Sequence, residues 1–226
     1  IFTSDNGGLA TAEGSPTCNA PLSEGKGWMY EGGTREPLIV RWPGVVKPGS
    51  TCGVPVTSPD FYPTLLEIAG LPLRSEQHVD GISLLPLLKG AQSLEREAIF
   101  WHYPHYGNQG GEPSSIIRKE DWKLIHYWED GRNELYYLPD DVGEQHDVAT
   151  SEPQRTSRLW SELHRWLEET GAKLPQPNPE YTEAMGKEHR KAAEALKERL
   201  ERTHAAYLQP EWQPNATWWD SLVPKD

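Results

Sequence analysis

The chain has 226 residues and a formal net charge of −12, with 25% charged and 10% aromatic residues. This composition is typical of a folded globular protein of one large or two small domains. The sequence has no basic stripe, which argues against nucleic-acid binding, and its net charge means that any site for an anionic substrate must be local. It has no apolar run long enough to span a membrane, so we expect a soluble protein.

The first segment, residues 1–95, has the pattern of part of an α/β domain. Short strands are predicted at IFTS (1–4) and from Leu38 to Trp42, where Pro43-Gly44 stops the second one. A helix is predicted to follow Ser58 as N-cap, with Pro59 at its first position. Its apolar face would consist of Phe61, Leu65, Ile68 and Ala69, and a further short helix or turn is predicted within residues 80–90.

The second segment, residues 96–171, changes to β-rich runs. These runs are 96–104, 114–119, 121–130 and 133–140, and Asp130-Gly131 marks a hairpin turn between the last two. An amphipathic helix is predicted within residues 150–171, with a capping box of Ser151 and Gln154. Its apolar face comprises Leu159, Leu163, Trp166 and Leu167. We therefore expect a small antiparallel sheet with a packed helix.

The third segment, residues 172–226, begins as a proline-rich linker. Residues 181–207 are predicted to be helical, supported by the pairs Glu183–Lys187 and Glu198–Arg202. The apolar stripe of this helix is thin: Met185, Ala192, Leu196 and Leu200. A Trp-rich and Pro-rich tail follows, in which Asn215-Ala-Thr217 formally matches a glycosylation acceptor.

Asp5-Asn6, followed by Gly7-Gly8, ends the first predicted strand. The carboxyl ends of strands in open α/β sheets are where ligands bind, and Asp and Asn oxygens suit Ca²⁺ or Mg²⁺. An ordinary Asx turn is the alternative, and for these residues alone it is the better interpretation.

A glycine-rich loop, EGKGWMYEGGTREP (24–37), provides a second candidate. Lys26 lies between two glycines, so its backbone can approach a ligand while its ammonium group reaches an anion. Arg35 can form a bidentate contact with a carboxylate or carbonyl nearby. A solvated lysine is again the simpler interpretation of the isolated motif.

The two motifs together are more specific than either alone. Asp5-Asn6, then Gly-Lys-Gly at 25–27, then Tyr-Glu-Gly-Gly-x-Arg-x-Pro at 30–37, then a strand ending in Trp42-Pro43-Gly44, closely resemble the type I sulfatase family of the alkaline phosphatase superfamily. Lys26 follows Asp5 by 21 residues, a spacing similar to that of arylsulfatases. The resemblance covers most of residues 1–145 and implies the C-terminal part of an alkaline-phosphatase-like α/β domain, followed by the small sheet-and-helix subdomain.

The resemblance implies roles for individual residues. Asp5 and Asn6 match two ligands of a divalent metal, usually Ca²⁺. Lys26 matches the lysine that contacts the sulfate and offsets charge on the ester oxygen as the S–O bond breaks. Arg35 matches a position that we interpret as structural support for the loop. In such a sulfatase a formylglycine hydrate attacks the sulfur.

The formylglycine motif of the family, C/S-x-P/A-x-R, has no match in this chain. Cys18 leads CNAPL and Cys52 leads CGVPV, and neither motif supplies the arginine. The family's other metal pair is absent too, since these parts precede the strand at Ile1. We therefore expect a C-terminal fragment, inactive alone, that requires the missing N-terminal part to cover an exposed apolar edge. The family resemblance implies a secreted or periplasmic location, whereas the two cysteines, which could pair, say little about compartment.

The segment FWHYPHYGNQGGEPSS (100–115) places His102 and His105 before a Gly-rich loop. In similar sulfatases the C-terminal subdomain contributes loops to the cleft, so both histidines are candidate contacts to a sulfated small molecule or glycan. Burial in an aromatic cluster at a strand end is the alternative. Helix packing explains Trp160 and Trp166, whereas Trp218-Trp219 are undecided.

Two rival functions stay open. A phosphodiesterase or phosphonate hydrolase on the same scaffold would share the metal site, although the context of Lys26 favours a sulfatase. A non-catalytic glycan-binding or structural module would use the aromatic residues without chemistry.

Overall fold

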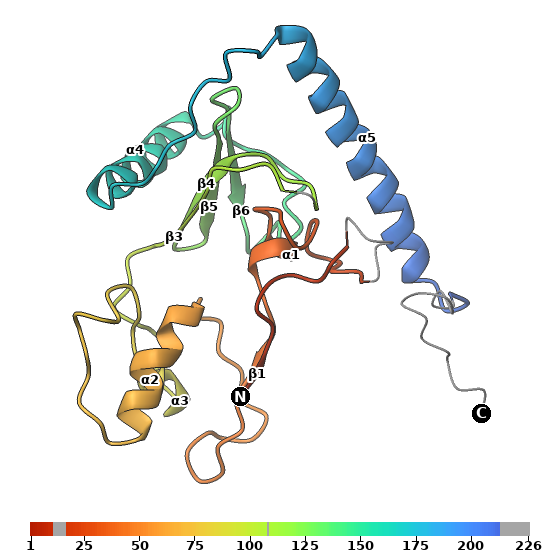
Figure 1. Ribbon diagram of the computed structural model, residues 1–226. Helices are drawn as coiled ribbons and strands as arrows, with labels where there is room; N and C mark the ends of the chain where they lie inside the picture. The colour runs from red at the N-terminus through yellow and green to blue at the C-terminus, as the bar shows by residue number, and fades with distance from the viewer. Residues whose placement is uncertain (11–16, 108, 213–226) are drawn as a thin grey trace. The chain divides into compact units, whose positions relative to one another are not determined.

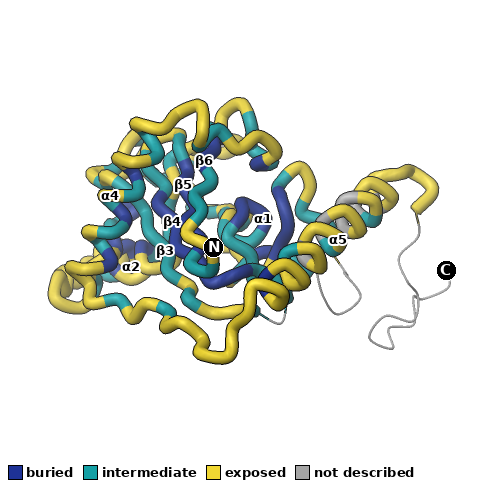
Figure 2. The backbone as a smooth tube through the Cα atoms, turned by 90° about the horizontal axis from the view of Figure 1, so that it is seen from above, coloured by how far each residue is buried: buried dark blue, intermediate teal, exposed yellow. Residues whose placement is uncertain are grey.

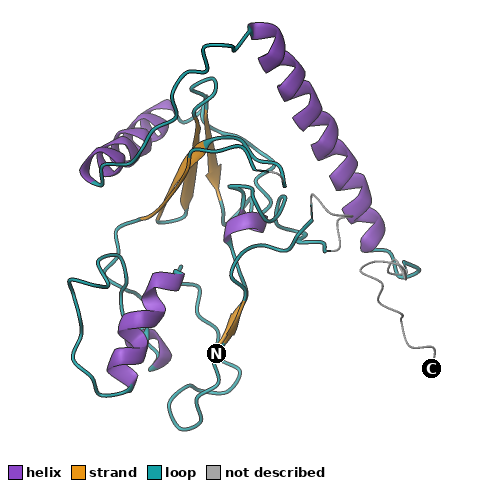
Figure 3. Cartoon of the chain, viewed as in Figure 1, coloured by secondary structure: helices purple, strands orange, loops and turns teal. Residues whose placement is uncertain are grey.

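The computed structural model describes residues 1–10, 17–107 and 109–212. Its elements run, in chain order, β1 (Phe2–Thr3), α1 (Glu31–Thr34), β2 (Leu38–Ile39), a 3-10 turn (Ser58–Asp60), α2 (Phe61–Ile68), α3 (Leu85–Leu88), β3 (Ile99–Tyr103), β4 (Ser114–Lys119), β5 (Trp122–Tyr127), β6 (Asn133–Tyr137), α4 (Pro153–Glu169) and α5 (Glu183–Tyr207). Figures 1 and 3 show these elements along the chain. The chain divides into two compact units, one of residues 1–5 and 37–97, the other of 6–36 and 98–226.

The first unit pairs two very short strands. β1 and β2 are antiparallel, with Phe2 opposite Ile39 and Thr3 opposite Leu38. The predicted strand from Leu38 to Trp42 was therefore too long, because its partner offers only two residues for pairing. Ile1, Phe2 and Ile39 are all more than half exposed.

The helical part of the first unit is organised by Asp60, which is fully buried. Its carboxylate accepts hydrogen bonds from the backbone N–H groups of Thr57 and Ile82, and it pairs with Arg96. Thr57 is the N-cap of the 3-10 turn and forms a capping box with Asp60. The prediction of Ser58 as N-cap was thus wrong by one residue, because the 3-10 turn already begins at Ser58.

The second unit is built on an antiparallel sheet in the order β3-β4-β5-β6. Adjacent strands pair over five or six residues, and Gly131 has a φ of 75° in the turn between β5 and β6, as the Asp-Gly signal predicted. In Figure 2 the central strands of this sheet are among the buried segments. This confirms the predicted small sheet.

One face of the sheet packs on α4. Ile117, Leu124 and Leu135 contact the helix side chains Leu159, Leu163 and Leu167, and all six are buried. Trp166 stacks on Phe100 and Trp160 stacks on His126, which confirms that both tryptophans serve helix packing. The capping box of Ser151 and Gln154 is wrong, however: α4 begins at Pro153 without a side-chain cap, and Ser151 donates to the carbonyl of Val148 instead.

The opposite face of the sheet carries the alternate residues. Ile116, Ile125, Tyr127 and Tyr136 form a second buried cluster with Tyr30 and Leu138, joined by the partly buried Trp28 and Met29. Because side chains alternate across a strand, each strand serves both clusters. The loop that carries Lys26 therefore packs directly on this second face.

Helix α5 is stabilised by surface pairs of the predicted kind, with Lys187 Nζ 2.8 Å from a carboxylate oxygen of Glu183. None of the helices in the described part of the chain is both long and apolar enough to cross a membrane. Cys18 and Cys52 are not joined in a disulfide. The sequence Asn215-Ala-Thr217 and Trp218-Trp219 lie outside the described residues.

Candidate functional site

The two motifs that the sequence singled out meet at a junction of five glycines: Gly7, Gly8, Gly25, Gly32 and Gly33. A Cβ added at any of them would overlap a neighbouring backbone or side-chain atom. At Gly25 it would meet the carbonyl oxygen of Gly8, and at Gly7 that of Gly32. None of the five has a positive φ, so close backbone approach, not conformational freedom, requires glycine here.

Hydrogen bonds connect the same segments. Lys26 donates its backbone N–H to the carbonyl of Gly8 at 3.1 Å, and Gly7 donates to Gly33 at 3.3 Å. The Asn19 amide donates to the carbonyls of both Gly8 and Glu24, at 2.9 and 2.8 Å. The turn after Asn6 and the loop around Lys26 are therefore held together.

Lys26 is exposed although Ser23, Glu24 and Gly25 before it are buried. Glu24 has a φ of 58°, a left-handed conformation that costs a non-glycine residue on the order of 1 kcal/mol. A hydrogen-bonded backbone segment thus presents an exposed ammonium group to solvent.

Asp5 and Asn6 lie where the chain passes from the first unit to the second. Asp5 is exposed and Asn6 is half-buried. Their carboxylate and amide oxygens are hard donors of the kind that Ca²⁺ and Mg²⁺ prefer, and two such donors are fewer than the six to eight oxygen ligands that Ca²⁺ takes.

Arg35 follows α1 directly, and its guanidinium group lies 3.7 Å from the Glu31 carboxylate. The Arg35 side chain is largely exposed, so the pair itself contributes little energy. Its position at the C-terminal end of α1 is nevertheless compatible with the expected support of the loop.

The Gly-rich loop after His105 packs against the residues next to Lys26. The indole N–H of Trp28 donates to the carbonyl of Gln109 at 3.0 Å. A Cβ at Gly110 would overlap the Trp28 ring, and one at Gly111 would overlap the carbonyl of Gly27. Residues 107 and 109–111 therefore border the loop that presents Lys26.

The two predicted histidines differ in their surroundings. His102 lies 3.0 Å from the Lys173 carbonyl through Nε2, which must donate, and 2.7 Å from the Ser115 hydroxyl through Nδ1. Both of its ring nitrogens thus hold the subdomain together. His105 is exposed, and its ring meets the edge of Tyr103 at a centroid distance of 5.4 Å.

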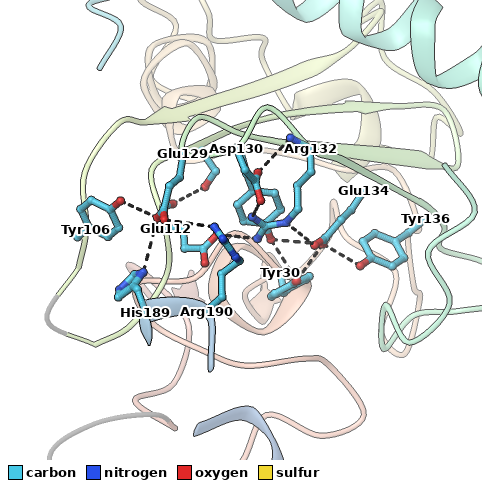
Figure 4. Close-up of polar contacts among 12 residues, drawn as sticks. Tyr30, Tyr106, Glu112, Glu129, Asp130, Arg132, Glu134, Tyr136, His189 and Arg190 are labelled. Carbon is cyan, nitrogen blue, oxygen red and sulfur yellow. Dashed lines mark hydrogen bonds and ion pairs between the residues drawn. The ribbon is translucent and has the colours of Figure 1, made fainter. Parts of the chain in front are cut away.

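Beneath the loop lies a network of phenols and charges (Figure 4). Tyr30 and Tyr136 each donate a hydrogen bond of 2.9 Å to the same oxygen of Glu134. Burial, then the neighbouring Tyr127 and Glu134, raise the pKa of Tyr30 well above its ordinary value. Tyr30 therefore stays protonated, and its hydrogen bond to Glu134 ties the loop that carries Lys26 to the sheet at residue 30.

Within the described residues, Glu112, Glu129 and His189 are the one group whose ligand atoms are close enough for a metal, all within 4.8 Å of one another. Figure 4 shows that these side chains already have charged partners. Arg132 lies 2.6 Å from Glu112, and Arg190 lies 3.7 Å from Glu129. Since the arginines already compensate both carboxylates, we assign no metal here.

Sequence reasoning missed a buried charged group below α1, formed by Glu31, Lys123 and Glu144. Lys123 is 1% exposed and lies in β5 on the same face as Ile125 and Tyr127. A lysine at a core-facing position of an alternating strand was the available signal, because such a residue needs a buried partner.

Comparison with known proteins gives a consistent picture. The family model described as N-sulphoglucosamine sulphohydrolase, C-terminal, matches residues 24–173. A sulfatase of Formosa agariphila is 37% identical over 182 residues, which are 74% of this chain and 32% of that protein. An N-acetylglucosamine-6-O-sulfatase of Bacteroides thetaiotaomicron is 32% identical, over 71% of this chain and 29% of its own length.

A solved structure of Ps i-CgsB is similar with a TM-score of 0.62 and 30% identity. The similarity covers 73% of this chain and 35% of that one, which confirms the predicted fold class. The chain spans about a third of the length of these relatives.

Proposed function

Because this chain belongs to the sulfatase family, as its match to the C-terminal family model over residues 24–173 shows, we propose that it is the C-terminal portion of an enzyme that hydrolyses a sulfate ester. The observation that carries this proposal is the glycine junction, which connects the Asp5-Asn6 turn to the loop of Lys26. In this proposal the chain contributes part of the active site and is inactive without the remaining part of the protein.

The family implies a divalent metal and a formylglycine nucleophile in general. We propose specifically that the metal is Ca²⁺ and that Asp5 and Asn6 supply two of its oxygen ligands. When bound, Ca²⁺ would neutralise charge on the sulfate oxygens. The remaining ligands and the formylglycine would come from residues outside this chain.

Lys26 is the proposed catalytic residue of this chain. Its exposed ammonium group would contact the sulfate and offset the negative charge that develops on the ester oxygen as the S–O bond breaks. The anchored backbone of residues 23–27 supports this role, because a preorganised cation needs no rearrangement during the reaction.

We propose a sulfated glycan as substrate, with an aryl sulfate as the broader alternative. One relative is named an N-acetylglucosamine-6-O-sulfatase. The exposed His105 precedes residues 107 and 109–111, which border the loop of Lys26, so it is the better placed histidine for a sugar contact. His102, with both ring nitrogens engaged, would support this segment, as Arg35 would support α1.

For location and partners, we propose a secreted or periplasmic protein whose remaining part covers the exposed Ile1, Phe2 and Ile39. Burying three large apolar side chains in this way would contribute roughly 1.5–3 kcal/mol each.

The central test changes Lys26 to Ala in the complete gene product. We expect turnover of 4-nitrophenyl sulfate and of a glucosamine sulfate to fall by about 10²- to 10³-fold. The loss should be larger for phenyl sulfate than for 4-nitrophenyl sulfate, because the poorer leaving group carries more charge that needs stabilisation. Lys47→Ala, in an exposed turn, is the matched control.

Turnover of Lys26→Ala within threefold of the wild type would show that this role is wrong. Parallel assays with phosphate and phosphonate esters separate the sulfatase from the related hydrolases on the same scaffold. Glycan binding without turnover of any ester would instead establish the non-catalytic module.

A further inference from the structure

Among the described residues of the second unit, Lys123, Glu31 and Glu144 form a buried group of charges. The Lys123 ammonium lies 3.1 Å from Glu31 Oε1 and 2.8 Å from Glu144 Oε1. The side chains of Lys123 and Glu144 are at most 1% exposed, and that of Glu31 is 7% exposed. Two carboxylates thus share one ammonium group away from water.

This group is tied to the backbone of the loop that carries Lys26. The second oxygen of Glu144 accepts the backbone N–H of Glu31 at 2.5 Å, which fixes the first residue of α1 five positions after Lys26. Next to it, the Ser23 hydroxyl donates to the carbonyl of Gly143 at 2.5 Å. Residues 143–144 therefore hold the loop on both sides of Lys26.

The two sides are also connected within the loop itself. Gly32 donates its N–H to the carbonyl of Ser23 at 2.8 Å. Any movement of Glu31 relative to β5 would therefore move Ser23 and with it the backbone that leads to Lys26. Glu144 has a φ of 51°, so its conformation, like that of Glu24, is imposed by its surroundings.

Stability alone does not explain this arrangement. Removing three charges from water has a large desolvation cost, and apolar residues of similar volume often stabilise such sites equally well or better. Lys123 is also shared by two carboxylates, and the second cation near Glu31, Arg35 at 3.7 Å, is largely exposed and compensates little of the buried charge. A buried ionic group can instead impose one geometry, because each partner must meet the others at hydrogen-bonding distance.

We propose that Lys123 is a positioning residue for Lys26, acting through Glu31 and Glu144, which together fix the loop at residues 23–32 on the sheet. This inference rests on the proposed catalytic role of Lys26. Lys123 does not touch the substrate in this proposal. Its ammonium group holds the backbone of residues 23–32 in place, and from this backbone the exposed Lys26 side chain reaches the substrate.

The test is a double-mutant cycle in the complete gene product. The variants are Lys123→Met, Lys26→Ala and the combination of both, assayed for kcat and KM per folded molecule. Lys123→Met keeps a long side chain but removes the charge that Glu31 and Glu144 require. Arg96→Met is the matched control, because it also leaves a buried carboxylate, Asp60, without its cation.

We expect Lys123→Met to lower kcat by about 10- to 100-fold, as a small misplacement of a catalytic group does. In the Lys26→Ala background the same change should lower kcat less than threefold, because the group that it positions is already absent. Arg96→Met should lower the melting temperature but leave kcat per folded molecule within threefold. Replacing both carboxylates in the Lys123→Met variant, by Glu31→Gln and Glu144→Gln, should recover stability but not kcat.

Equal losses of kcat from Lys123→Met in both backgrounds would overturn the inference, since Lys123 would then act independently of Lys26. An unchanged kcat in Lys123→Met would overturn it too. Failure of the underlying function is distinguishable: in that case Lys26→Ala alone would leave turnover unchanged. If Lys123→Met does not fold, Lys123→Arg replaces it in the cycle, with the same predictions at smaller amplitude.

Discussion

The two faces of the β3–β6 sheet are stabilised in different ways. The face toward α4 is mostly apolar, with Ile117, Leu124 and Leu135 packed on leucines of the helix, and it includes the buried His126. The face toward the loop of residues 23–36 combines Ile116 and Ile125 with tyrosines and with the buried Lys123. Apolar packing is non-directional, whereas hydrogen-bonded charges define positions. We therefore infer that the α4 face contributes mainly to the free energy of unfolding, whereas the opposite face mainly fixes the position of the loop of residues 23–36.

The largest effect that separates the two faces should come from Leu163→Ala on the α4 face. Leu163 is fully buried, so its truncation leaves a cavity and should reduce the free energy of unfolding by about 2–5 kcal/mol. Urea denaturation measures this loss. Turnover per folded molecule should stay unchanged, and a loss of turnover similar to that of Lys123→Met would abolish the distinction between the faces.

An intermediate loss of stability, together with a loss of turnover, should result from Gly33→Ala in the loop. The added methyl group would overlap the carbonyls of Trp28 and Gly25, and overpacking of this kind costs roughly 1–3 kcal/mol. Here the loop must move, so turnover should fall together with stability. Gly53→Ala is the control, since a Cβ at Gly53 meets nothing within 4 Å. A full-activity Gly33→Ala enzyme would mean that the junction tolerates displacement.

The smallest expected effect is on the pH dependence of the melting temperature, and it involves His126 on the α4 face of the sheet. Burial lowers the pKa of His126, partly opposed by the hydrogen bond that its Nδ1–H donates to the Asn133 amide oxygen and by Asp130, while His164 lowers it further. The unfolded chain therefore binds more protons than the folded one just below pH 6.5, and stability is lost as the pH falls through this range. We expect His126→Gln to reduce the drop in melting temperature between pH 7.5 and 5.5 by a few degrees at most.

His146→Gln, whose side chain is 83% exposed, is the comparison for this measurement. The assignment of the effect to His126 fails if both variants show the same dependence of melting temperature on pH as the wild type.

The parts of the fold that local patterns determine were predicted well. Alternation along β4 and β5, the Asp130-Gly131 turn and the leucine spacing of α4 each arise within a few residues, so the sheet and its helix were predictable. The lengths of strands and the caps of helices were predicted less well. The length of β2 depends on its short partner β1, and the start of α4 depends on Pro153. These features are determined by neighbours that a local pattern does not contain.

The candidate site shows the same limit. Lys26 and the Asp5-Asn6 pair could be proposed as site residues because short motifs carry them. Glu31 and Glu144 were not, because their significance depends on Lys123, a residue far away in the sequence. A charged residue within a core-facing strand position predicts that a partner exists but does not identify it.

The separation of these partners along the chain has a consequence for synthesis. Lys123 lies 92 residues after Glu31, and Glu144 lies 113 residues after it. At about 5–20 residues per second, a ribosome needs on the order of ten seconds to cover this distance. Until then the loop around Lys26 lacks its charged anchors. The position of the proposed catalytic lysine would therefore be fixed late in translation, and any chain that ends before residue 144 carries this lysine without the contacts of Glu144 that we propose to orient it.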